Sequence, residues 1–206
     1  AMGRSAMAAN TTGQYNTGIG ALALQANTTA DGNTAVGYQS AYSNTTGTRN
    51  AAFGIQALYS NVTGTDNTAI GRVALNANTA SANTAVGSGA LYANTTGNTN
   101  IAIGVAALYS NTTASNNMAV GYQAAYNNTT GGVVAFGAGT LRANTTGSNN
   151  VFIGSAAGKA VTTGSSNTFI GSGVLNVSDG SGSVMTTGSK NTILGNYNGN
   201  QGGLDI

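Results

Sequence analysis

The sequence predicts an all-β fold, a parallel β-solenoid of about twelve coils with 17 residues in each. Three observations indicate this fold. A short strand-like string recurs at a fixed interval, Gly, Asn and Thr fill the positions between its copies, and every change of interval falls in those positions. The string is Asn-Thr-Ala-Val-Gly at 33–37, and close copies return at 67–71, 83–87 and 167–171.

The repeat is defined by the glycine that closes each copy. These glycines are Gly3, Gly20, Gly37, Gly54, Gly71, Gly87, Gly104, Gly121, Gly137, Gly154, Gly171 and Gly195, and eight of their eleven intervals are 17 residues long, two are 16 and one is 24. The irregular intervals change length at 78–82, 130–132 and 178–184, always in the Asn-Thr-Thr-Gly half of the unit. Loops tolerate changes of length and packed strands do not. We therefore expect that half to be a turn and the Asn-Thr-Ala-Val-Gly half to be a packed strand.

A unit of this length is too short for a helical repeat, which needs about 33 residues or more. Gly, Asn and Thr are also weak helix formers. Two short strands joined by turns fit the unit, and coils stacked about 4.8 Å apart make a rod roughly 55 Å long. We expect one solenoid array over 1–195 and an exit segment over 196–206 that leads to a further domain.

The first strand is apolar on both of its faces. We expect the large residues directly before each glycine to fill the coil interior. Those residues are Ile19, Val36, Phe53, Ile70, Val86, Ile103, Val120, Phe136, Ile153, Ile170 and Leu194. One coil cannot enclose both faces, so a partner chain is expected to cover the opposite face. The predicted inter-chain residues are Ala35, Ala52, Ala69, Ala85, Ala102, Ala119 and Ala135.

The second expected strand carries Ala-Leu, with the Leu side chains inside at 24, 58, 75, 91, 108, 141 and 175. A column of tyrosines follows and is expected to point outward: Tyr42, Tyr59, Tyr92, Tyr109 and Tyr126. Two interpretations of this column stay open. The rings are either a surface on which sugar rings stack, or ordinary strand residues that pair with one another along the ladder.

Polar columns complete the coil. Asn recurs at 16, 33, 50, 67, 83, 100, 117, 150, 167 and 191, a spacing at which amide side chains form ladders. Arg49 and Asp66 occupy the same position in neighbouring coils and are expected to pair. The turns also contain Asn-x-Thr sequons, such as those at Asn27 and Asn94, which turn chemistry explains without glycosylation.

The string Asn67-Thr68-Ala69-Ile70-Gly71, with the small-residue run and the Gly turn behind it, resembles the head repeats of YadA-like trimeric autotransporter adhesins. Similar arrays occur in bacteriophage tail fibres, and the segment 187–199 looks like the end of such an array. The resemblance covers nearly the whole chain. It implies a left-handed β-roll, a homotrimer, and a place outside the cell on a virion fibre or a bacterial surface. The 17-residue period is longer than that of a typical head repeat, and these residues show no stalk or membrane-anchor pattern, so we expect a fibre segment.

The composition argues against several classes of function. The chain has no His and no Cys, which removes the usual metal clusters and catalytic triads. Its only carboxylates are the dispersed Asp31, Asp66, Asp179 and Asp205, so we expect no enzyme, no cofactor and no metal site. The six Lys and Arg residues are scattered, which argues against nucleic-acid binding. No apolar run reaches the roughly 20 residues of a membrane span.

These observations favour a structural or adhesive fibre segment that provides an extended rod and an attachment surface, with a host-surface glycan or receptor as its partner. Two alternatives stay open. One is a monomeric solenoid that binds a glycan through Tyr or ice through the paired threonines, such as Thr112-Thr113. The other is a subunit of an extracellular filament that assembles through its open end coils.

Overall fold

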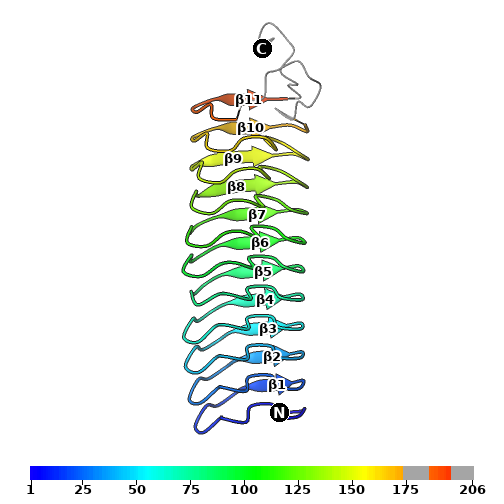
Figure 1. The fold of residues 1–206 in the computed structure, drawn as a ribbon, viewed down its shortest axis with the longest axis vertical. Helices are drawn as coiled ribbons and strands as arrows, with labels where there is room; N and C mark the ends of the chain where they lie inside the picture. The colour runs from blue at the N-terminus through cyan, green and yellow to red at the C-terminus, as the bar shows by residue number, and fades with distance from the viewer. Residues whose placement is uncertain (174–185, 196–206) are drawn as a thin grey trace, which may run out of the picture.

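The chain folds into a straight rod of stacked coils (Figure 1). The structure is a computed structural model, and it describes residues 1–173 and 186–195. Each strand is three or four residues long, and the strands are β1 Thr17–Ile19, β2 Thr34–Val36, β3 Ala51–Phe53, β4 Thr68–Ile70, β5 Thr84–Val86, β6 Ile101–Ile103, β7 Met118–Val120, β8 Val133–Phe136, β9 Asn150–Ile153, β10 Thr168–Ile170 and β11 Thr192–Leu194.

The strands form one parallel sheet in chain order, from β1 to β11. Equivalent residues of successive repeats are partners, as in the pairs Ala102↔Ala119 and Ile103↔Val120. The described residues contain no helix. The predicted all-β parallel solenoid with 17-residue spacing is therefore confirmed, while the left hand and the count of about twelve coils stay predictions. Residues 196–206, the expected exit segment, lie outside the described residues.

Each coil contains one strand, so the second predicted strand is wrong. The Ala-Leu half of the coil is a run of turns, although its backbone still bonds to the next coil, as in Leu108 N–H to Ala124 O at 3.0 Å. The reason is a left-handed backbone at alternate residues, which prevents an extended strand. In the coil that follows β6, Ala106 has φ 56° and Leu108 has φ 50°.

The glycine after each strand makes the corner, as expected. Gly104 has φ 132°, and the other corner glycines from Gly3 to Gly171 have φ between 126° and 150°. A side chain does not fit there, because a Cβ on Gly137 would lie 2.5 Å from the backbone oxygen of Gly154 in the next coil. The corner column therefore requires Gly for both conformation and space.

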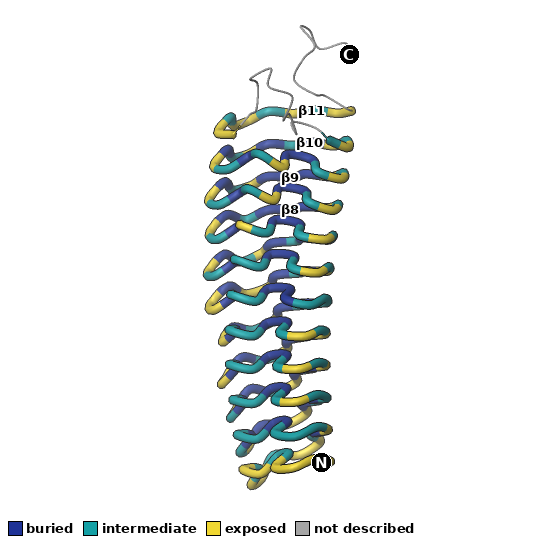
Figure 2. Tube along the Cα trace, turned by 45° about the vertical axis from the view of Figure 1, so that its right-hand side comes forward, coloured by how far each residue is buried: buried dark blue, intermediate teal, exposed yellow. Residues whose placement is uncertain are grey.

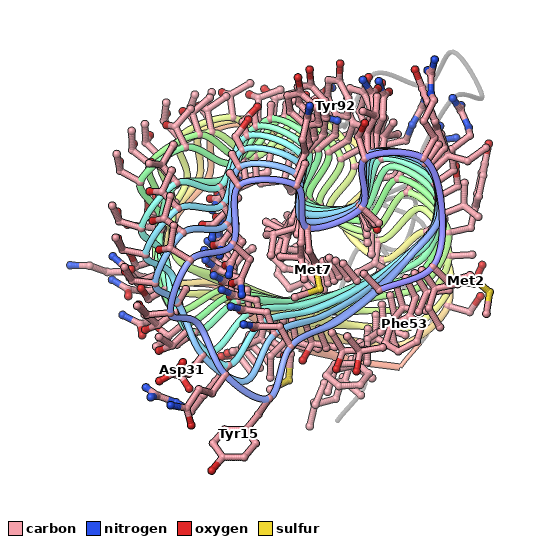
Figure 3. The ribbon with its side chains drawn as sticks, turned by 90° about the horizontal axis from the view of Figure 1, so that it is seen from below. Met2, Met7, Tyr15, Asp31, Phe53 and Tyr92 are labelled. Atoms are coloured by element: carbon pink, nitrogen blue, oxygen red, sulfur yellow. The ribbon has the colours of Figure 1, made fainter. Side chains whose placement is uncertain are left out.

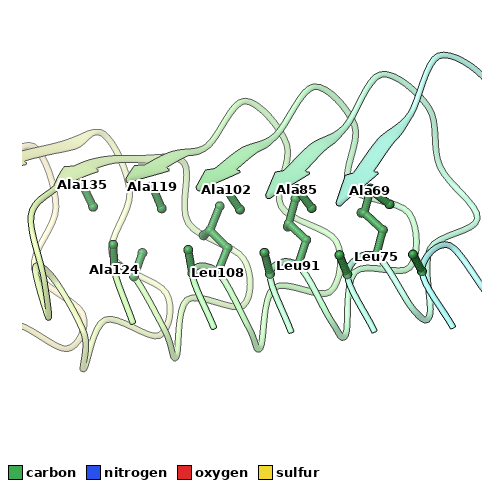
Figure 4. Close-up of a cluster of buried hydrophobic side chains, with 14 of the residues drawn as sticks. Ala69, Leu75, Ala85, Leu91, Ala102, Leu108, Ala119, Ala124 and Ala135 are labelled. Carbon is green, nitrogen blue, oxygen red and sulfur yellow. The ribbon is translucent and has the colours of Figure 1, made fainter. Parts of the chain in front are cut away.

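The apolar core lies between the sheet and the opposite wall of the coil. The Leu side chains point inward, as predicted, and meet the strand alanines (Figure 4). Leu24, Leu58, Leu75, Leu91, Leu108 and Leu141 are all fully buried. Leu175 lies outside the described residues. Buried and exposed segments recur at the same places from coil to coil, and the N-terminal coil is mostly exposed (Figure 2).

At some positions a larger side chain on one wall of the core lies opposite a smaller one on the other wall. Phe152 replaces the usual strand alanine, and Gly158 stands where the opposite wall usually has Leu. The Phe152 ring occupies that space, since a Cβ on Gly158 would overlap it. At the other end Gly18 faces Met7 in the same way. The coil thus has room for one large side chain per layer, from either wall.

The other half of the coil interior is polar and holds two Asn columns, seen as blue nitrogens inside the end-on view (Figure 3). The expected column is confirmed, since Asn50 donates both its N–H and its Nδ2 to Asn33 Oδ1, at 2.9 and 3.1 Å. A second column, not foreseen as a ladder, is formed by the sequon asparagines, such as Asn61 Nδ2 to Asn44 Oδ1 at 3.0 Å. Both columns also donate to the same turn carbonyl, Gly64 O in this coil. These bonds satisfy amide groups that would otherwise be costly to bury. The exceptions among the described residues are Asn61 Oδ1 and Asn144 Oδ1, which are buried without a hydrogen-bond partner.

Candidate functional site

The outer face of the sheet is apolar, and the two strand faces are the reverse of the prediction. The strand alanines have no exposed surface in the single chain, so they cannot contact a partner chain. They are Ala35, Ala52, Ala69, Ala85, Ala102, Ala119 and Ala135, all at 0%. The large residues before each glycine point outward instead, as Phe53 does in the end-on view (Figure 3). In most coils the physical reason is the narrow interior, in which the opposite Leu leaves room only for a methyl group. Ala41 and Ala125 take the Leu position opposite Ala35 and Ala119.

We call this outward surface the sheet face, defined by the residue before each corner glycine and the residue two positions earlier. Ile19, Ile70, Ile103, Ile153 and Ile170 each expose 40–41% of their surface. From β6 to β9 both rows of the sheet face are apolar, with Ile101, Ile103, Met118, Val120, Val134, Phe136, Val151 and Ile153. The sheet face is therefore most apolar over four consecutive coils.

The Tyr column lies outside the coil on the wall opposite the sheet, where Tyr92 is seen in Figure 3. Its rings stack on one another. Tyr42 and Tyr59 have ring centroids 5.1 Å apart and planes 5° from parallel, and Tyr92, Tyr109 and Tyr126 form a second stack at 5.0 and 5.1 Å. Arg142 lies over the free face of Tyr126 at 5.8 Å. Within a stack each inner ring face is covered by a neighbour, which leaves sugar rings no access to it.

The Tyr column has a break that the sequence interpretation missed. Asn76 occupies the column position between Tyr59 and Tyr92, as the bonds from Ser60 N–H to Asn76 O and from Ala77 N–H to Tyr92 O show. Its side chain turns back to the coil below and donates Nδ2 to Gln56 O at 3.2 Å. The 17-residue register alone places Asn76 in this column, so counting along it would have found the break.

The paired threonines do not form a broad regular surface. In most pairs the first hydroxyl donates to a backbone carbonyl of the next coil, as in Thr95 Oγ1 to Thr112 O at 3.0 Å. The second Thr is exposed at a bend, and its row is interrupted at the short coil, where Ala80 directly follows Thr79. The sequon asparagines from Asn27 onward are buried in the second ladder, so an oligosaccharide cannot reach their Nδ2 in the folded chain.

Charged groups are few along the described part of the rod. Arg49 and Asp66 pair as expected, with Nε to Oδ1 at 2.7 Å and Nη2 to Oδ2 at 2.9 Å. The hydrogen bonds from Arg49 lower the pKa of the Asp66 carboxyl, and the pair raises the pKa of Arg49. Asp31 accepts a hydrogen bond from the Gln14 N–H. Asp179 and Asp205 lie outside the described residues.

The described residues contain neither a metal-binding cluster nor a membrane-spanning helix. No group of three or more His, Cys, Asp and Glu side chains there is arranged to hold a metal ion. No helix there has the length and apolar character needed to cross a membrane. When the chain is compared with protein-family models, with curated proteins and with solved structures, nothing matches.

Proposed function

We propose that this chain is a structural segment of an extracellular fibre, in which copies associate side by side through the sheet face. The observation that supports this most is the continuous row of exposed and half-buried large apolar residues along the outer side of an 11-stranded sheet. The role is non-enzymatic, which the absence of His and Cys supports. The resemblance to adhesin heads and tail fibres supports a place on a virion or a bacterial surface, with host attachment as a second role.

The size of the sheet face supports association. Ten strand spacings of about 4.8 Å and a width of three residues, at about 3.3 Å each, give roughly 500 Å² per chain. Part of this area belongs to threonines of the second row, and both rows are apolar from β6 to β9. A contiguous exposed apolar patch of this order often marks an interaction site. Covering this face with the same face of another copy removes it from water and leaves the buried core unchanged.

The resemblance to trimeric adhesin heads favours three chains over two. Three faces of about 500 Å² meeting on one axis bury roughly 1,500 Å² in total, or about 500 Å² at each of three contacts, and two faces bury about 1,000 Å² at one contact, so the area alone does not select the number of chains. A closed ring of identical chains also ends the association, since no sheet face is left exposed. The proposed assembly is therefore a homotrimer with the sheet faces at its centre.

Molecular mass in solution tests the proposal. We expect the wild-type chain to be a trimer by light scattering and the Ile103→Lys variant to be a folded monomer, because a charge on the sheet face is not tolerated at the axis. Thr113→Lys, on an exposed bend, is the matched control and should stay trimeric.

The buried alanines provide a second control. Ala102→Asp should lose β-structure altogether, since it places a carboxylate in the coil interior. A monodisperse wild-type monomer, or a trimer unchanged by Ile103→Lys, would rule out assembly through the sheet face. Growth into long end-to-end polymers would instead support the filament alternative.

A further inference from the structure

We propose that the break in the Tyr column is a binding slot for one pyranose ring of a glycan, with Tyr59 and Tyr92 as its two walls and Asn76 as its floor. The proposal deepens the attachment role suggested above by naming a site and a ligand class. It does not depend on the number of chains, because the Tyr column lies on the wall opposite the sheet face.

The ring faces along the Tyr column differ in what covers them. Tyr42 and Tyr59 form one stack, and Tyr92, Tyr109 and Tyr126 form the other. The outer end of the second stack is covered by Arg142. Along the column, only the faces of Tyr59 and Tyr92 look toward each other with no ring between them.

The distance between the Tyr59 and Tyr92 faces suits a puckered ring. Neighbouring rings in each stack lie 5.0–5.1 Å apart. Tyr59 and Tyr92 are two coils apart, so their rings are separated by about 10 Å, twice the strand spacing. A flat ring in contact with both walls needs only about 7–8 Å, whereas a puckered ring with axial hydrogens fills more of this distance.

The walls and the floor of the slot carry groups that interact with sugars. An aromatic face carries partial negative charge and attracts the polarised C–H groups of a sugar. An Asn side chain is shorter than Tyr, so we expect Asn76 to occupy only the base of the gap and to leave the outer parts of the rings open. Asn76 Nδ2 is held by Gln56 O. Its Oδ1 makes no hydrogen bond among the described residues and is available to a sugar hydroxyl.

The test uses a variant that completes the column without harming the fold. Asn76→Tyr introduces the commonest residue of the column and should join the two stacks, which closes the slot while the chain stays folded. Gln25→Tyr is the matched control, because it extends the lower stack below Tyr42 and leaves the slot open.

The probes are methyl glycosides of glucose, galactose, mannose and N-acetylglucosamine at millimolar concentration. Binding is measured by saturation-transfer NMR and by tyrosine fluorescence, since the chain has no Trp. We expect at least one glycoside to bind the wild type and the Gln25→Tyr variant alike. Asn76→Tyr should lose about tenfold or more in affinity, the order expected for a lost stacking contact.

Several results would overturn the slot. They are the absence of binding by all four glycosides, equal binding by Asn76→Tyr, or tighter binding of a flat aromatic such as indole. Light scattering on the same samples separates this failure from failure of the fibre proposal. A trimer that binds no sugar rejects the slot alone, and a monomer that binds sugar rejects the side-by-side assembly alone.

Discussion

At the scale of single residues, the fold depends on side chains held at a left-handed backbone. Leu24, Leu75 and Leu108 all have φ near 50°. This conformation costs a non-glycine residue about 1–2 kcal/mol, and complete burial of a Leu side chain contributes about 1.5–3 kcal/mol. Burial therefore offsets the backbone cost at these positions, and the core keeps a residue that the local backbone disfavours.

The corner glycines have no such compensation. Gly137→Ala is expected to destabilise the chain by about 3 kcal/mol or more, because the new Cβ meets the Gly154 backbone oxygen at a strained φ of 130°. Gly139→Ala is the matched control two residues away. It has φ 65° and no atom within 4 Å of the new Cβ, so it should cost only about 1 kcal/mol. Chemical denaturation measures both, and equal losses would show that space at the corner is unimportant.

At the scale of the coil, the two walls are matched in volume, which a double-mutant cycle tests. Phe152→Ala should cost about 3–5 kcal/mol through the cavity it leaves. Gly158→Leu should also destabilise, since its side chain overlaps the Phe152 ring. The double variant restores the Ala and Leu of the other coils and should recover at least about 2 kcal/mol relative to the sum of the single changes.

Unfolding midpoints of the four proteins give the coupling free energy. The two single variants serve as each other's controls, since each disturbs the same layer from a different wall. Simple additivity would mean that the two walls do not share one space.

The matched volumes of the two walls also explain which features of the coil can be predicted from the sequence. The Gly corner, the inward Leu108 and the Asn ladder follow from the period and from residue chemistry. The direction of the Ala102 and Ile103 side chains does not follow from the sequence in this way. Strand alternation shows that the two side chains point in opposite directions, but it leaves open which of them points into the coil. Leu108 on the opposite wall leaves space only for a methyl group, so Ala102 points inward and Ile103 points outward. In the coil of β9, Phe152 replaces the usual strand Ala and Gly158 replaces the usual Leu. This paired replacement was the sign in the sequence that the two walls share one narrow space.

The second strand and the candidate site were predicted less completely for related reasons. Left-handed Ala106 and Leu108 contradict the usual preference of these residues, so local propensity favours a strand where a turn forms. The outward direction of the Tyr column followed from the register. The stacking of its rings, and so the importance of Asn76, depends on side-chain orientations that only the assembled coils determine.

At the scale of the whole molecule, stability should respond little to pH. The chain has no His and no Glu, and four Asp are its only acidic side chains. The hydrogen bond from Arg49 lowers the Asp66 pKa in the folded state. That contribution is present above the ordinary Asp pKa of about 4 and is lost as the pH falls through the lowered value.

Denaturant midpoints at pH 5, 7 and 9 should therefore coincide, with a decline only in stronger acid. Asp66→Asn should reduce the acid decline while leaving the neutral midpoint nearly unchanged, as expected for an exposed pair. A large change between pH 5 and 9 would contradict this view of the charges.

The bonds that join the coils also determine how the rod responds to pulling. Each backbone bond between coils links a residue to one about a coil further along, as from Ala51 N–H to Asn67 O, and the strands stack along the rod axis (Figure 1). Tension applied to the two ends therefore loads the outermost coil first and peels one coil at a time. Each event shortens the rod by about 4.8 Å and releases 17 residues, about 55–60 Å of extended chain. A fibre built this way yields in even steps under load and dissipates force, with every unpeeled coil still intact as a template for rewinding.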